Sequence, residues 1–197
     1  MDFISTDQEW VISIICAIIG AIIGSIIAIT STIIWDNHKN MKRYKALLKT
    51  IHFELQENKK KIDNTITQIP EDLKILFKSA KNSNVKISDE QISRLAWTFP
   101  KPYSIDAWQA FISSGLVIKL SVDNLQRLYH LYDDLHSINF LSNLSVNLFQ
   151  ILASDNRLDQ ETNKNFDRFC KIGTLSLVFA ISEYIQNTIA KIKRITN

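Results

Sequence analysis

Basic side chains are missing from the start of this sequence. No Lys or Arg precedes Lys39, and residues 10–35 carry no charge of either sign. Residues 1–35 hold Asp2, Asp7 and Glu9, a side-chain charge of −3. Because the whole chain has a formal charge of +3, the remainder carries +3 − (−3) = +6. The acidic start and the length of the apolar run argue against a cleaved signal peptide, which needs a basic start and a shorter core.

Other absences narrow the class of protein. The two cysteines, Cys16 and Cys170, fall in different parts of the chain, so a disulfide scaffold is not expected. None of the four glycines belongs to a phosphate-binding loop or a nucleophile elbow. Alternating strand patterns and internal repeats are also missing. The sequence therefore predicts an all-α protein, and we expect no cofactor, no bound metal and no enzyme activity.

The uncharged run predicts a membrane-spanning helix over residues 10–35. At ~1.5 Å per residue it is ~39 Å long, enough to cross a ~30 Å hydrocarbon core. Trp10 and Trp35 stand at its two ends, where interfacial anchors are expected. Five basic residues and one acid follow between Asp36 and Thr50. Basic flanks stay in the cytoplasm, so we expect a single-pass protein of the inner or plasma membrane, with residues 1–9 outside.

Small residues recur every four positions along one face of this segment: Cys16, Gly20, Gly24 and Ala28. Small side chains let two helix backbones approach closely in lipid. This spacing predicts packing against a second copy or a partner's membrane helix. The alternative is that glycine and alanine are simply common in membrane helices.

The segment 36–69 is predicted to continue as one long helix that ends before Pro70. Its apolar residues follow a heptad-like spacing, with Asn58 at one seam position: Met41, Tyr44, Leu48, Ile51, Leu55, Ile62 and Ile69. Two interpretations are open. The seam either forms a coiled-coil stalk between copies or packs against the chain's own domain, and we favour the second.

Residues 70–197 are predicted to form an antiparallel helical bundle in the cytoplasm. Helices are expected from Pro70 to about Lys81, over 89–98 after a capping box at Ser88 and Gln91, from a Ser104 cap to Gly115, from 122 to 153, and from 159 to 195. A kink or break is expected near 139–143. The aromatic residues Trp97, Tyr103 and Trp108 are interpreted as core packing, with a partner surface as the alternative.

The best candidate for chemistry is the group His130, Asp133, Asp134 and His136. With the apolar face of this helix set by residues 125, 128, 129, 132 and 135, the first three are predicted to be solvated and His136 to pack beside the core. A metal or catalytic site is not expected. The basic clusters are explained by orientation and by solvated helix faces, so nucleic acid is not an expected partner either.

Several loosely spaced motifs together resemble a class of small prokaryotic proteins with an N-terminal span and a helical domain. They are Glu54-Leu55-x-x-Asn58, Trp108 with Ser114-Gly115-Leu116, and Leu125-x-x-Leu128-Tyr129-x-x-Tyr132. The resemblance covers roughly residues 10–140. It implies a fold and a topology and supplies no catalytic residues.

We expect this protein to be a membrane-anchored scaffold or recruitment module that binds lipid, self-associates and has a cytoplasmic protein partner. The alternative is an effector whose assembled spans perturb the bilayer, as in toxin-like or phage-defence systems. Growth arrest with dye entry on overexpression would favour the effector. An enzyme with an unrecognised site is a third hypothesis.

Overall fold

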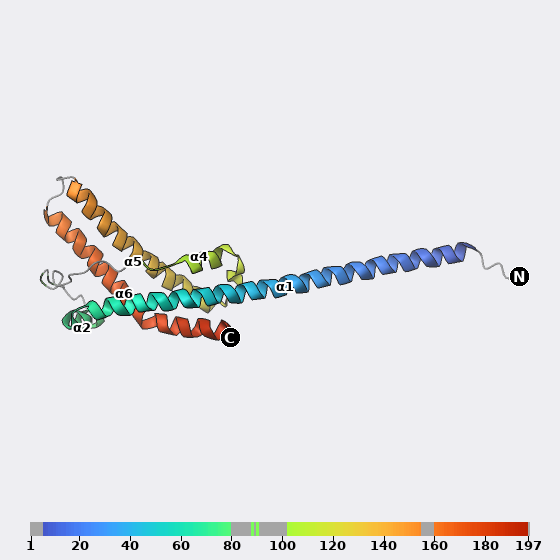
Figure 1. Ribbon diagram of the computed structural model, residues 1–197, viewed down its shortest axis with the longest axis horizontal. Helices are drawn as coiled ribbons and strands as arrows, with labels where there is room; N and C mark the ends of the chain where they lie inside the picture. Colours follow the sequence, from blue (N-terminus) through green and yellow to red (C-terminus); the bar gives the residue numbers. More distant parts are fainter. Residues whose placement is uncertain (1–5, 80–87, 89, 91–101, 155–159, 197) are drawn as a thin grey trace. The chain divides into compact units, whose positions relative to one another are not determined.

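The computed structural model describes residues 6–79, 88, 90, 102–154 and 160–196 (Figure 1). All of its regular structure is helical, which confirms the all-α prediction. The described helices are α1 (Thr6–Gln68), α2 (Glu71–Ser79), α4 (Asp106–Ser113), η2 (Leu116–Lys119), α5 (Val122–Ser154) and α6 (Gln160–Thr196). The chain divides into two compact units, Met1–Tyr44 and Lys45–Asn197, which we call unit 1 and unit 2.

The helix α1 passes from unit 1 into unit 2 without a break in its hydrogen bonding. It ends at Gln68 because proline at position 70 disfavours helical geometry in the residue before it. The carbonyl of Pro70 then accepts hydrogen bonds from Leu73 and Lys74, at 3.1 and 3.0 Å, and α2 begins. Glu71 and Asp72 occupy its first turn, where acidic side chains offset the helix dipole.

The seam of α1 is buried inside unit 2 over residues 48–69. Leu48, Ile51, Leu55 and Ile62 have no exposed surface, and Ile69 is 5% exposed. The structure therefore supports the interpretation that this seam packs against its own domain and leaves no open seam there for a coiled-coil stalk. At the far end of this stretch, Leu73 and Phe77 of α2 join Ile69 in a cluster with Leu175 and Phe179 of α6.

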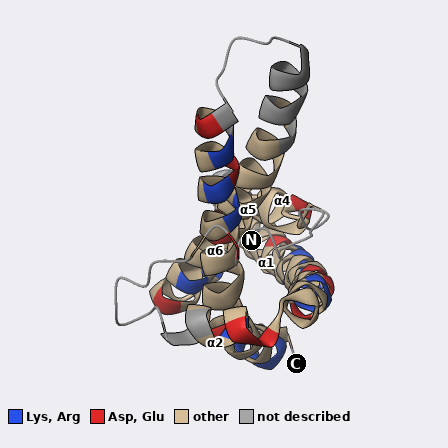
Figure 2. Ribbon diagram, turned by 90° about the vertical axis from the view of Figure 1, so that its left-hand side faces the viewer, with Lys and Arg blue, Asp and Glu red and all other residues tan. Residues whose placement is uncertain are grey.

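The helices α5 and α6 form an antiparallel pair. Small residues allow them to approach closely, since a Cβ added at Gly173 of α6 would lie 3.1 Å from Leu141 Cδ1 of α5. Ser142, Ser145 and Thr174 are buried along these two helices. Both signs of charge occur along α1 and α6 (Figure 2). The helix α5 runs from Val122 to Ser154 as one element, so there is no break near 139–143.

The buried face of α5 differs from the predicted one. Leu128, Leu131, Leu135 and Ile138 are fully buried, whereas Tyr129 is 58% exposed. At ~100° per residue this face is rotated by roughly 60° from the predicted stripe. The prediction used only the spacing within 125–135, whereas in the structure α5 packs on α6 as well as reaching α1. The rotation leaves His136 exposed, so its predicted place beside the core is wrong.

Gly115 ends the helix α4 as predicted, but Ser104 does not cap its start. Gly115 has φ = 70°, a left-handed conformation that glycine adopts without steric cost. At the other end, the capping position belongs to Ile105, whose side chain makes no capping hydrogen bond. The acceptor for the start of α4 comes instead from α1. The predicted helix over 89–98 and its capping box lie mostly outside the described residues.

Candidate functional site

The segment predicted to span the membrane is exposed along its whole described surface. Of the residues from 10 to 35, every one whose side chain is described is exposed, including Trp10 at 73% and Trp35 at 71%. Within the described residues, α1 is the one helix long and apolar enough to cross a membrane. Its most apolar window has a mean hydropathy of 2.5, and none of that window is buried. A core helix of a soluble protein would instead be covered by its own chain.

Three of the five hydroxyl groups of this segment find acceptors inside the helix. Ser25 donates to the carbonyl of Ala21 at 2.7 Å, and Thr30 donates to that of Ile26 at 2.6 Å. Thr32 makes the same bond one turn back. A polar group in hydrocarbon must be satisfied by the protein itself. These hydroxyls therefore carry little cost in lipid.

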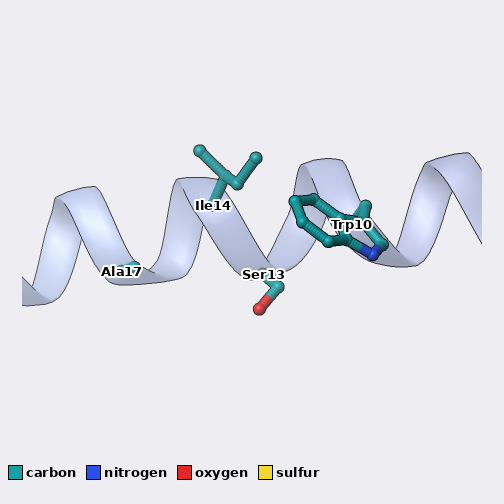
Figure 3. Close-up of a pocket in the computed structure, with 4 residues that line it drawn as sticks. All are labelled: Trp10, Ser13, Ile14 and Ala17. Carbon is teal, nitrogen blue, oxygen red and sulfur yellow. The ribbon is translucent and has the colours of Figure 1, made fainter.

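The small-residue face of α1 meets nothing in the chain. A Cβ added at Gly20 or Gly24 would have no other atom within 4 Å. Close packing inside the chain therefore does not explain these two glycines. Cys16, four positions before Gly20, is a free and exposed thiol. Nearer the N-terminus, Trp10, Ser13, Ile14 and Ala17 surround a shallow hollow on the side of the same helix (Figure 3). It is open to the surroundings, so we assign it no ligand.

A buried polar cluster in unit 2 holds the connecting segment 102–107 against α1 and α5. We call it the Glu54 cluster. Glu54 of α1 is 7% exposed. Its carboxylate accepts hydrogen bonds from Ser104 Oγ at 2.5 Å, from the backbone N–H of Ala107 at 3.0 Å and from the Tyr132 hydroxyl at 2.7 Å. Ala107 lies in the first turn of α4, where unpaired N–H groups and the helix dipole favour a negative charge.

Two asparagines complete this cluster by pairing with the backbone as a neighbouring strand would. Asn58 donates to the Ser104 carbonyl at 2.7 Å and accepts from the Ser104 N–H at 3.0 Å. Asn139 of α5 makes the same two bonds with Tyr103, both at 2.8 Å. An extended segment has no helical partners for its backbone, so these side chains supply them. Asn58, the polar residue at a seam position of α1, therefore binds the chain's own backbone.

Tyr132 is a second residue that joins α5 to this cluster. Trp108 stacks on its ring, with centroids 5.2 Å apart and planes 4° from parallel. Burial, and then the nearby charge of Glu54 and the hydrogen bond to it, raise the pKa of Tyr132 above its usual value of 10.0. The phenol is therefore held in its neutral, donating form. The bonds of the cluster therefore join α1, α5 and the segment 102–107.

The aromatic group proposed as a possible partner surface is not exposed where it is described. Tyr103 and Trp108 are 3% and 7% exposed. This corrects the partner-surface alternative for these two residues and supports core packing. They are buried because the asparagine and glutamate contacts draw their segment inward. Trp97 lies outside the described residues.

The group around His130 is also divided by the structure. His130 and Asp133 are exposed, as predicted. Asp134 is half-buried and accepts a hydrogen bond from the hydroxyl of Tyr184 on α6, so the prediction that it is solvated is wrong. Burial, followed by this bond and the charges of Asp134 and Asp133, raises the pKa of Tyr184. Among the described residues, no three His, Cys, Asp or Glu side chains are grouped to hold a metal ion.

No family model, curated protein or solved structure matches this chain. Four residues of the motifs that carried the resemblance to membrane-anchored helical proteins lie together in the structure. Glu54, Asn58 and Tyr132 all belong to the Glu54 cluster, and Trp108 stacks against it. Sequence reasoning missed Ser104 and Asn139 as members, because a residue that bonds to a distant backbone has no local pattern.

Proposed function

We propose that this protein is a non-enzymatic, membrane-anchored helical module, with residues 10–35 as a single span and unit 2 in the cytoplasm. The observation that carries the anchor is the uncharged helix whose described side chains are all exposed. So much apolar surface in water would be strongly unfavourable, at about 25 cal/mol per Å². The hydroxyls of Ser25, Thr30 and Thr32 are satisfied inside the helix, which suits a lipid environment.

The orientation follows from charge. The residues between Asp36 and Thr50 carry five basic side chains, and none precedes the span. A reporter that is active only in the cytoplasm should work when fused to the C-terminus, and a reporter that needs the outside should not. Alkaline washing should leave the protein in the membrane fraction. The reverse reporter pattern would refute the orientation, and release by the wash would refute the anchor.

We further propose that the span associates with a second copy or a partner helix through Cys16, Gly20, Gly24 and Ala28. The support is the spacing of these residues together with the empty space around both glycines. Close approach of two backbones would fill that space and gain van der Waals contact.

The test is Gly20→Ile with Gly24→Ile, which adds bulk without adding polarity. The protein should stay in the membrane, and its self-association in a two-hybrid assay of spans should fall. The matched control, Ile19→Leu with Ile23→Leu, should change little. Crosslinking through Cys16 gives an independent measurement. Wild-type association in the glycine variant would leave the small-residue face as ordinary membrane composition.

Unit 2 is proposed to present a folded surface to a cytoplasmic protein partner. The Glu54 cluster supports a structural role for its own residues, because each donor and acceptor named in it has a partner inside the fold. Pull-down of the full-length protein from detergent extract, compared with a Glu54→Ala variant that disturbs unit 2, tests this part. Loss of a specific partner in the variant is the expected result, and an identical set of partners would argue that unit 2 does not recruit it.

A further inference from the structure

Two helix termini and a short helix gather at the end of unit 2 that begins with Lys45. The bond between Glu54 of α1 and Tyr132 of α5 fixes one level along these helices. Further along both helices, Asn58 and Asn139 reach the adjacent backbone residues 103–104. The two helices therefore run in the same direction past this segment, and the start of α5 lies on the Lys45 side of the cluster.

The helix α6 returns to the same end. Gly173 of α6 lies close to Leu141 of α5, and Tyr184 of α6 bonds to Asp134 of α5. Residue numbers therefore rise along α6 where they fall along α5, so the two helices are antiparallel. Residues 191–196 thus come level with the first turns of α5. Figure 1 shows the C-terminal end of α6 and the start of α5 at the same place along the long axis.

The short helix η2 belongs to this end as well. The chain reaches η2 through α4. Pro102 bonds to Lys61, Ser104 to Asn58 and Ala107 to Glu54, so the chain approaches the Lys45 side of α1 as it advances. The helix α4 therefore starts beside Glu54 and runs toward that side. The helix η2 then connects directly to the start of α5. We call this end of unit 2 the proximal end. It consists of η2, the first turns of α5, the last turns of α6 and residues 45–49 of α1.

The proximal end combines exposed apolar side chains with positive charge. Ile118 in η2 is 84% exposed, and Val122 at the start of α5 is 69% exposed. The same end of unit 2 carries exposed basic side chains together with the carboxylate of Asp123: Lys45, Lys49, Lys119, Arg127, Lys193 and Arg194. Exposed apolar and basic side chains at one end of a domain are the chemistry that binds an anionic lipid surface.

The chain itself keeps this end near a bilayer. Only residues 36–44 separate the uncharged segment from unit 2, and as a helix they are ~14 Å long. This length exceeds the Debye length of ~8 Å at physiological salt, so the charges of the proximal end are attracted strongly only when unit 2 approaches the surface. A short connection of this kind gives docking a high effective concentration. Docking is therefore a state that the lipid composition can favour.

We propose that the proximal end docks onto anionic lipids of the membrane that anchors the chain, with Ile118 and Val122 entering the headgroup region. This inference rests on the proposed anchor. Docking would set the orientation of unit 2 on the membrane according to the anionic lipid content. It would also give Lys193 and Arg194, at the end of α6, a binding partner.

The experiment uses the full-length protein in nanodiscs of zwitterionic lipid alone or with added phosphatidylserine. An environment-sensitive fluorophore is attached at Ile118→Cys in a background lacking Cys16 and Cys170, and lipids with quenching groups report contact. The matched control is Ile75→Cys on α2, since Ile75 is also exposed (64%) and lies at the other end of unit 2. Quenching is expected at position 118, only with phosphatidylserine, and not at position 75.

Charge variants give the magnitude. Each basic side chain near an anionic surface contributes about fivefold to binding. Lys193→Gln with Arg194→Gln should therefore weaken docking roughly 25-fold. Lys59→Gln with Lys60→Gln removes the same charge from α1, away from the proximal end, and should leave docking within about twofold.

Each remaining outcome overturns the proposal. A fluorophore at position 118 that stays in water with both lipids would assign the exposed isoleucine to a protein partner instead. Equal quenching at positions 118 and 75 would indicate non-specific adsorption. Either result leaves the anchor intact. If the full-length protein is not retained by nanodiscs at all, the anchor fails together with this inference.

Discussion

Replacing Glu54 with alanine removes the acceptor on which three parts of unit 2 converge. The Ser104 hydroxyl, the Ala107 N–H and the Tyr132 hydroxyl would each lose their partner in a buried place. The pocket would also lose a charge that favours the N-terminus of α4. We therefore expect unit 2 to open more readily while the membrane segment is unaffected.

The magnitude follows from the number of bonds. Leaving a buried donor without an acceptor costs ~1–3 kcal/mol. Three such bonds, each at the lower part of that range, give a loss of about 3–4 kcal/mol. That is a large part of the ~5–15 kcal/mol by which domains are usually stable. Glu54→Gln should lower the free energy of unfolding by less than Glu54→Ala does. The amide oxygen of glutamine still accepts a hydrogen bond, whereas its amide nitrogen faces other donors and accepts none.

The thiol of Cys170 provides the assay. It is free and has no exposed surface, and burial, then the charge of Asp167, raises its pKa. In a background without Cys16, it reacts with a maleimide only when unit 2 opens. When reclosing is fast, the labelling rate follows the population of the open form. A loss of about 3–4 kcal/mol should raise this rate roughly 100- to 1,000-fold.

Glu57→Ala is the matched control on the same helix. Within the described part of the chain, Glu57 forms a surface pair with Lys60 at 2.6 Å, and such pairs contribute less than ~0.5 kcal/mol. If Glu54→Ala labels no faster than Glu57→Ala, the Glu54 cluster is not what holds the segment 102–107. A double variant with Tyr132→Phe should cost less than the sum of the two single changes, because they share one bond.

Two further predictions concern α5 and its neighbours. Asp134→Asn should lower the free energy of unfolding by ~1 kcal/mol because it weakens the hydrogen bond from Tyr184. Asp133→Asn should change the free energy of unfolding by no more than ~0.5 kcal/mol. The same Cys170 labelling measures both variants, and equal effects would contradict the structure. The pKa values of Tyr132 and Tyr184 are raised in the folded protein, so unfolding releases protons when the pH exceeds about 10, the pKa of a tyrosine in the unfolded chain. The stability that is present below pH 10 should therefore fall as the pH rises further. Replacing both tyrosines with phenylalanine should flatten that alkaline fall in a labelling or circular dichroism titration, and an unchanged slope would assign it to other groups.

The sequence alone determined those features that depend on neighbours along the chain. The uncharged run before Trp35 made α1 helical and apolar, since a helix of that composition satisfies its own backbone. Pro70 and Gly115 set helix boundaries by local steric rules that need no tertiary contact. The ends of the described α-helices were accordingly predicted to within a few residues. The heptad spacing of α1 correctly indicated six buried apolar side chains, those of Tyr44, Leu48, Ile51, Leu55, Ile62 and Ile69, whereas Met41 is 43% exposed.

Only the tertiary structure decided what each buried face meets. The rotation of α5 that exposes His136 depends on a second partner, α6, which the spacing within α5 does not encode. The role of Asn58 depends on an extended segment 46 residues away, and Glu54 caps a helix 53 residues further along the chain. Hydrogen bonds between distant residues carry no periodic signature. Their partners are fixed only when packing brings the elements together, and for that reason the polar cluster at the centre of unit 2 could not be predicted from its residues.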